Sequence, residues 1–279
     1  MAGTKRSWEG KPLRDDGTQT QTAIAMSEPS GQILSIFRTF RDELDEHHDR
    51  RERLVKISRD ITALSKKIVR TINAPIPASI AKETQSRFTQ IQDLFRSTVP
   101  DITGINNWRY QRQLSGAVQE FIEAISFRQY LQTQTLISLE EVTTQLPSEI
   151  LVTEEDYLMG LFDLTGEMMR FAITTLSTGA QKQQTDSTEE VENTGHSKLG
   201  DSQAGIVVDL REMRSLFEGL SVPRRHNTFM YKDMAKKMDV MQSSVEKVER
   251  AAYGILVRGS ERPAGWMPDL SAPVEMESY

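Results

Sequence analysis

The stretch LSGAVQEFIEAISFRQYLQTQTLIS, residues 114–138, has the apolar spacing of an α-helix and carries two glutamates one turn apart. At about 100° per residue, its apolar side chains gather on one side, and Glu120 and Glu123 lie on the opposite side. The apolar side consists of Val118, Phe121, Ile122 and Ile125. The ordinary interpretation of an acidic face is that it is solvated. However, Phe127 and Leu131 continue the line of Glu120, so we expect this helix to be packed on two sides, with the acids near an edge of the packing.

Helical periodicity extends outward from this stretch, and no segment has the pattern of a β-strand. Helices are predicted over about 33–72, 80–97, 103–131, a short one opening at 138–141, 153–176, 206–220 and 228–257. Ser138 and Glu141 have the spacing of a capping box, and Thr153 is placed to cap the helix that follows it. The sequence therefore predicts an all-α fold, a single bundle of seven helices with a long first helix.

The first and last helices carry apolar stripes at spacings of three and four. The first stripe is Leu34, Phe37, Leu44, Leu54, Ile57, Ile61, Leu64 and Ile68. The last is Met234, Met238, Met241, Val245, Val248 and Ala252. Four further segments complete the domain prediction: a disordered tail over 1–30, a folded domain over 31–261, a flexible polar loop over 179–205 within it, and a flexible tail over 262–279.

The composition narrows the class of protein. The chain has 279 residues, of which 37% are hydrophobic and 27% charged, and it has no cysteine, which excludes disulfides, thiolate catalysis and Cys-based zinc sites. No apolar window is long enough for a membrane span, and no secretion signal is expected. The net charge of −6 argues against a protein that coats nucleic acid nonspecifically, so any nucleic-acid surface must come from locally clustered Lys and Arg.

The helix predicted over 153–176 has its own acidic stripe. Asp156, Gly160, Asp163 and Glu167 follow one another at i, i+4, i+7 and i+11. Glycine costs roughly 1 kcal/mol in a helix interior, so Gly160 indicates close approach by another element. The alternative is a solvated face in which Arg170 pairs with Glu167 at i, i+3.

If the two helices face each other, Glu120, Glu123, Asp163 and Glu167 converge. Four carboxylates held together repel unless a cation lies among them, and hard oxygen ligands favour Mg²⁺ or Mn²⁺ over zinc. Such a site supports hydrolysis of phosphodiesters. The hypothesis requires Glu123 and Asp163 to share one cation; otherwise only a scaffold remains.

Several separated segments closely resemble the translin family, in its translin-associated factor X branch. They are HDRRERLVKISRDITALSKK (48–67), QEFIEAISF (119–127), LISLEEV (136–142), DYLMGLFDLTGEMMRF (156–171) and KVERAAYGILVRGSE (247–261). The resemblance covers about residues 33–262, apart from the polar loop and a shorter connection before Asp156. It implies a seven-helix translin-like bundle that forms a hetero-oligomer with translin, the component 3 promoter of RISC.

The resemblance also implies an activity. Members of this branch bind RNA and single-stranded nucleic acid, cleave RNA with Mg²⁺, remove passenger strands of small interfering RNA and process transfer-RNA fragments, in the cytoplasm and the nucleus. The catalytic acids of the family fall on Glu120, Glu123 and Asp163, and Glu167 is the fourth acid.

Basic residues near these acids are candidates for RNA binding. NNWRYQRQ, residues 106–113, alternates aromatic and basic side chains; Trp108 would stack on bases while Arg109 and Arg112 hold phosphates. The alternative is that Trp108 packs in the core. In the first helix, Arg51 interrupts the apolar stripe, which marks either a second basic surface or the point where the helix docks on translin.

Two functions follow from these patterns. One is the catalytic subunit of a Mg²⁺-dependent endoribonuclease, and the other is a non-catalytic adaptor that stabilises translin and binds nucleic acid. Substitution of Glu123 by Ala distinguishes them. Because the helices are strongly amphipathic, we also expect the isolated chain to self-associate and co-expression with translin to prevent this.

Overall fold

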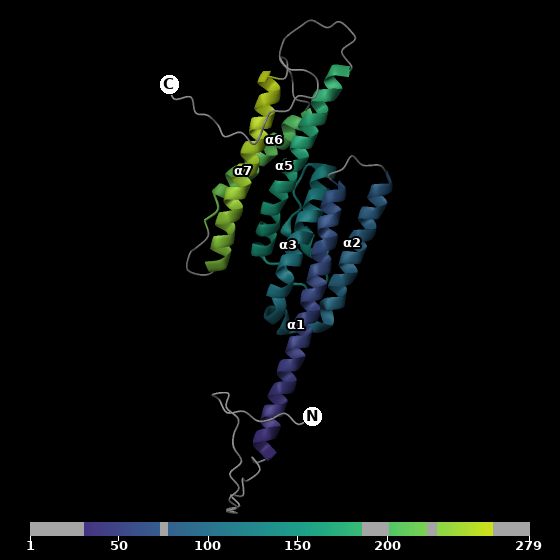
Figure 1. Ribbon diagram of the computed structural model, residues 1–279, viewed down its shortest axis with the longest axis vertical. Helices are drawn as coiled ribbons and strands as arrows, with labels where there is room; N and C mark the ends of the chain where they lie inside the picture. Colours follow the sequence, from purple (N-terminus) through teal and green to yellow (C-terminus); the bar gives the residue numbers. More distant parts are fainter. Residues whose placement is uncertain (1–30, 73–77, 186–200, 222–227, 259–279) are drawn as a thin grey trace, which may run out of the picture. The chain divides into compact units, whose positions relative to one another are not determined.

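The computed structural model describes residues 31–72, 78–185, 201–221 and 228–258. These ranges contain seven α-helices, one short 3-10 helix and no strand, which confirms the all-α prediction (Figure 1). The elements are α1 (Gly31–Ile72), α2 (Ala78–Thr98), η1 (Val99–Asp101), α3 (Asn106–Thr133), α4 (Leu139–Thr144), α5 (Glu154–Thr185), α6 (Asp201–Glu218) and α7 (Thr228–Arg258). The long first helix is also confirmed, since α1 has 42 residues.

The expected polar loop over 179–205 is shorter than predicted. α5 continues to Thr185 and α6 begins at Asp201, so both ends of the expected loop are helical. The end of α5 has no apolar stripe, but Ala, Gln and Lys favour helix without one. The middle of that loop, 186–200, and the tails predicted over 1–30 and 262–279 lie outside the described residues.

Both predicted helix caps are present. The Ser138 hydroxyl accepts a hydrogen bond from the backbone N–H of Glu141 at 3.2 Å, and the Glu141 carboxylate accepts one from the backbone N–H of Ser138 at 2.7 Å. The Thr153 hydroxyl accepts a bond from the backbone N–H of Asp156 at 3.1 Å. Each cap satisfies amide donors that the first turn of a helix leaves without intrahelical partners.

The described residues from His48 to Arg258 form one compact unit, with α5 at its centre. α5 packs against α3 on one side and α7 on the other, and α6 contacts both α5 and α7 (Figure 1). Aromatic contacts join the layers: Phe121 of α3 meets Phe88 and Phe95 of α2 edge to face, and Phe162 of α5 stacks on Phe217 of α6 with centroids 4.0 Å apart. α3 is thus packed on two sides, as its sequence predicts, and Phe127 is fully buried.

The apolar stripe of α1 divides into two parts. In its second half Leu54, Ile61 and Ile68 are fully buried. Residues 31–47 belong to a separate unit, and there Phe37 and Leu44 are 66% and 68% exposed. The first half of the helix therefore presents apolar side chains to solvent. None of the described helices is apolar enough over a sufficient length to cross a bilayer.

Candidate metal and nucleic-acid site

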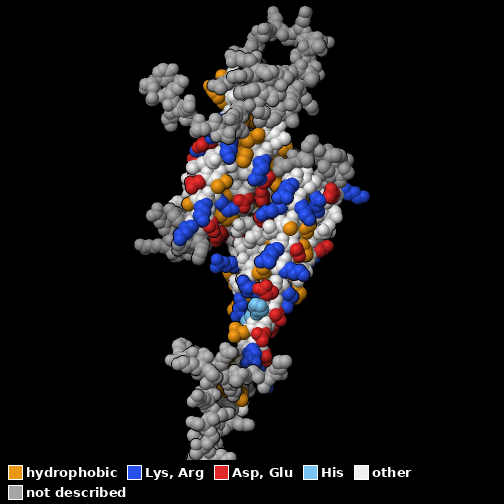
Figure 2. All heavy atoms as spheres, in the orientation of Figure 1, with side chains coloured by type: hydrophobic (Ala, Val, Ile, Leu, Met, Phe, Trp, Pro, Cys, Tyr) orange, Lys and Arg blue, Asp and Glu red, His pale blue; other side chains and the backbone are white. Residues whose placement is uncertain are grey.

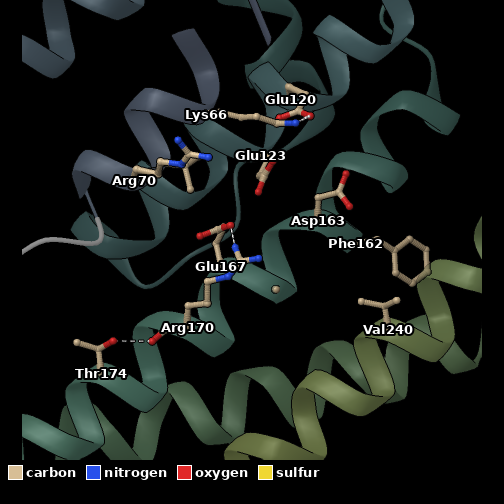
Figure 3. A pocket seen from close by; sticks show the side chains of 12 residues that line it. Lys66, Arg70, Glu120, Glu123, Phe162, Asp163, Glu167, Arg170, Thr174 and Val240 are labelled. Atoms are coloured by element: carbon tan, nitrogen blue, oxygen red, sulfur yellow. Dashed lines mark hydrogen bonds and ion pairs between the residues drawn. The ribbon is translucent and has the colours of Figure 1, made fainter. Parts of the chain in front are cut away.

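The four predicted acids line one pocket of about 690 Å³ between helices. Glu120 and Glu123 come from α3, and Asp163 and Glu167 come from α5 (Figure 3). The two acidic stripes therefore face the same cavity, which is the condition under which the sequence predicts their convergence. We call this cavity the acidic pocket; Lys66 of α1 and Arg170 of α5 also line it.

The close approach of α3 and α5 depends on Gly160. A Cβ atom added there would lie 2.7 Å from Ile122 Cγ2 and 2.9 Å from the Gln119 carbonyl oxygen, so only glycine fits without a shift of α3. One turn earlier, Asp156 is fully buried and accepts hydrogen bonds from α3, from Ser115 and from Gln119 at 2.9 Å. These contacts hold the two helices in register, and this register brings their acids to the same cavity.

Glu123 is the most strongly perturbed acid in the pocket. Its side chain is buried, and no hydrogen bond or ion pair reaches it from any described residue. Burial, which is the largest cause, and the nearby carboxylates Glu120 and Asp163 together raise its pKa from 4.5 to about 8, against the opposing effect of Arg170 and Lys237. Near neutral pH the carboxyl group is therefore largely protonated.

The other three acids are each paired with a basic side chain. Lys66 Nζ lies 2.9 Å from Glu120 Oε1, and this bond raises the pKa of Lys66. Lys237 Nζ of α7 lies 2.5 Å from both carboxylate oxygens of Asp163. Arg170 pairs with Glu167 at i, i+3, as the alternative of a solvated acidic face requires, although Glu167 itself is buried. Three of the four acids are thus neutralised by ion pairs and the fourth by a proton.

The donor set suits a hard divalent cation, because it consists of carboxylate oxygens and includes the buried Glu120 Oε2, which has no hydrogen-bond partner. The compact cluster that one shared cation needs is nevertheless not formed. Among the described residues, no three His, Cys, Asp or Glu side chains come close enough to hold a metal ion together. In Figure 3 the Asp163 carboxylate is turned away from Glu123, on the side where Lys237 binds it. The expectation that Glu123 and Asp163 point at one common ion is thus not met while Lys237 binds Asp163; a cation shared by the two acids requires the release of Asp163 from Lys237.

The residues predicted to bind RNA lie outside the acidic pocket. Trp108 is 72% exposed, which excludes the alternative that it packs in the core. Arg109 and Arg112 are also exposed, in the first two turns of α3. At 1.5 Å per residue, Trp108 lies about 18 Å along the helix axis from Glu120. Arg51 is exposed and pairs with its neighbour Glu52 at 2.7 Å, so the break in the α1 stripe is a solvated position.

Sequence reasoning missed three basic residues near the acids: Lys66, Arg70 and Lys237. Lys66 and Arg70 are one turn apart on α1, so their spacing could have marked a basic edge beside the buried stripe. Nothing in the sequence signals that Lys237 reaches Asp163, which is 74 residues away. Figure 2 shows the result: acidic side chains in the middle of one face, with Lys and Arg side chains around them.

Comparison with known proteins agrees with the fold. Residues 49–259 match the translin family. The chain belongs to the translin family. The translin-associated protein X of Rattus norvegicus is 30% identical over 276 residues, which cover 88% of this chain and 87% of that protein.

Solved structures show the same fold as this translin-family chain. The crystal structure of apo-NeC3PO has a TM-score of 0.54 at 15% identity and covers 77% of this chain and 94% of its own. That of AfC3PO has a TM-score of 0.51 at 22% identity and covers 77% and 93%.

Proposed function

We propose that this chain is the catalytic subunit of a translin-containing hetero-oligomer that cleaves RNA phosphodiesters with Mg²⁺, or with Mn²⁺ in its place. The observation that carries the proposal is Glu123: a buried carboxyl group, without a partner among the described residues, in a solvent-connected pocket with three more acids. Leaving such a group unpaired destabilises a fold, so its presence points to a use. The relatives support a role beside translin, because two of them, each 30% identical to this chain, are named translin-associated protein X.

The side chains of the acidic pocket would serve two purposes, to bind the metal ion with its water and to attract the phosphate. Glu120, Glu123 and Asp163 would hold the metal ion and orient a water molecule, and Glu167 would assist. When bound, the ion lowers the pKa of water and neutralises charge on the phosphate. Arg70, which lines the same pocket, would attract the substrate phosphate.

The RNA strand would continue from the acidic pocket along α3 to Trp108, Arg109 and Arg112, which are exposed. Aromatic stacking and phosphate contacts bind single strands of many sequences. Arg51, exposed on α1, would add a further phosphate contact. Passenger-strand removal and transfer-RNA processing, in the cytoplasm and the nucleus, are the roles that we propose for this activity.

A second function, that of a non-catalytic adaptor, is favoured by one observation. The described acids do not form a cluster that is ready for a metal, and three of them have basic partners. An adaptor would need the same helix surfaces for translin and nucleic acid, with the ion pairs serving only to hold α1, α3, α5 and α7 together.

The experiment compares three forms of the full chain, each co-purified with translin: wild type, Glu123→Ala and Glu212→Ala. Glu212 is an exposed acid on α6 and serves as the matched control. Cleavage of a short single-stranded RNA is followed with Mg²⁺, with Mn²⁺ and with EDTA, and RNA affinity is measured by fluorescence anisotropy.

Loss of cleavage in Glu123→Ala at unchanged stoichiometry and RNA affinity supports the nuclease. Equal cleavage by all three forms, or cleavage that persists in EDTA, refutes it and leaves the adaptor.

A further inference from the structure

The ion pair between Lys237 and Asp163 occupies the oxygens that a metal ion would need. Lys237 Nζ is 2.5 Å from each carboxylate oxygen of Asp163 and 3.4 Å from the Met159 carbonyl oxygen. One ammonium group therefore contacts both oxygens, as a bound cation would. Figure 3 shows the Asp163 carboxylate turned away from Glu123, so this pair also sets the direction in which the acid points.

The ion pairs of the other acids in the pocket also stand against the binding of a metal ion in this arrangement. Glu120, Asp163 and Glu167 each already face a basic side chain. A divalent ion added to this arrangement without any rearrangement would meet three cations and few free negative charges. Metal loading therefore has to release a basic side chain from an acid.

Lys237 has a second possible carboxylate partner. It lines a small neighbouring cavity of about 190 Å³, together with Asp233 and Lys236. Asp233 lies four residues before Lys237 on α7, the spacing at which helical side chains of opposite charge pair. Asp233 is exposed and makes no ion pair with any other described residue. The lysine can thus exchange one carboxylate for another by rotation of its flexible side chain.

We propose that Lys237 is a tethered counter-ion that competes with the divalent cation for Asp163, and that it moves to Asp233 when the metal binds. This inference rests on the proposed metal-dependent function and adds its regulation. In the metal-free chain Lys237 holds Asp163 away from Glu123. In the metal-loaded chain Asp163 turns into the acidic pocket, and the Lys237 ammonium group pairs with Asp233 on α7.

The test measures Mn²⁺ affinity, by calorimetry and by the electron paramagnetic resonance signal of free Mn²⁺, on the full chain co-purified with translin. Lys237→Met removes the competitor and keeps the length of the side chain. Lys236→Met removes the same charge from the next residue, which is exposed and has no ion pair among the described residues. We expect Lys237→Met to bind Mn²⁺ about three- to fivefold more tightly, the effect of one partly exposed ion pair, and Lys236→Met to stay within about twofold of wild type.

A second variant tests the exchange itself. Asp233→Asn removes the alternative partner, so it should weaken Mn²⁺ binding about twofold in wild type and have no such effect in the Lys237→Met background. Equal effects in both backgrounds overturn the exchange with Asp233.

The results separate the two proposals. If wild type binds Mn²⁺ and Lys237→Met binds it equally or more weakly, competition by Lys237 is refuted and the metal site stands. If Lys237→Met alone binds Mn²⁺, the competition is stronger than expected and both proposals are supported. If no form binds Mn²⁺, both are refuted.

Discussion

The buried carboxyl group of Glu123 makes the stability of this chain depend on pH in a direction opposite to that of most acids. Its pKa is raised from 4.5 to about 8, mainly by burial. Between these values the native state binds a proton that the unfolded state has lost. The free energy of unfolding therefore falls as pH rises through this range, by about 1.36 kcal/mol per unit, and the loss is complete above about pH 8.

Glu123→Gln removes this dependence while it preserves the size of the side chain. The full shift of the pKa from 4.5 to about 8 corresponds to about 5 kcal/mol. We expect the difference in unfolding free energy, variant minus wild type, to be small near about pH 5 and to increase by this amount toward about pH 9. A constant cost of burying the amide would shift the whole curve without changing its slope.

The assay is urea unfolding of the full chain at one protein concentration, over that pH range, in EDTA so that no metal ion competes with the proton. Glu212→Gln, an exposed acid on α6, is the control and should follow wild type at every pH. A difference between Glu123→Gln and wild type that does not change with pH, or that grows toward acid pH, would show that Glu123 is ionised in the fold. The electrostatic description of the pocket would then be wrong.

Three other predictions test the packing of α3 against α5, the cap of α4 and the exposed apolar surface of α1. Gly160→Ala should destabilise the chain by about 1–3 kcal/mol in urea unfolding, because the added Cβ would come within 2.7 Å of an α3 side chain. Gly116→Ala is the control: no atom lies within 4 Å of the added Cβ, so this variant should stabilise the chain by about 0.5–1 kcal/mol. Ser138→Ala should cost about 1 kcal/mol, the usual value of a helix cap; an unchanged midpoint would mean that the α4 capping box is dispensable. The double variant Phe37→Ser, Leu44→Ser should reduce the self-association of the isolated chain, measured by light scattering, because both apolar side chains are exposed. Unchanged scattering would mean that another surface mediates the self-association.

The sequence predicted which helix faces of the candidate metal site are acidic, but it did not predict how deeply each acid is buried. The spacing of Glu120 and Glu123, and of Asp163 and Glu167, indicated two acidic stripes, and Gly160 indicated where the helices touch. The burial of these acids was not predictable. Glu120 and Glu123 occupy similar positions in the apolar pattern of the helix, and yet of these two only Glu123 is buried. That difference depends on how α1 and α7 cover the pocket.

The segment that the sequence predicts as a polar loop over 179–205 shows where hydrophobic periodicity fails to predict a helix. Its ends are helical although they carry no apolar stripe, because intrinsic propensity suffices to extend a helix that is already formed. Likewise, the apolar stripe of α1 continues into residues 31–47, where nothing in the described chain covers Phe37 or Leu44. Periodicity shows which face of a helix is apolar, and it does not show whether this chain or another one buries that face.

The sequence by itself determined the helices, their caps at Ser138 and Thr153, and the faces that carry acids. These features arise from interactions between residues three or four apart, so a local pattern contains all the information they need. Only the tertiary structure decided that Lys66 holds Glu120, that Lys237 holds Asp163 and that Glu123 keeps a proton instead of a partner. These pairings join side chains that are 54 to 74 residues apart, and they depend on the packing of whole helices, which no short stretch of sequence encodes.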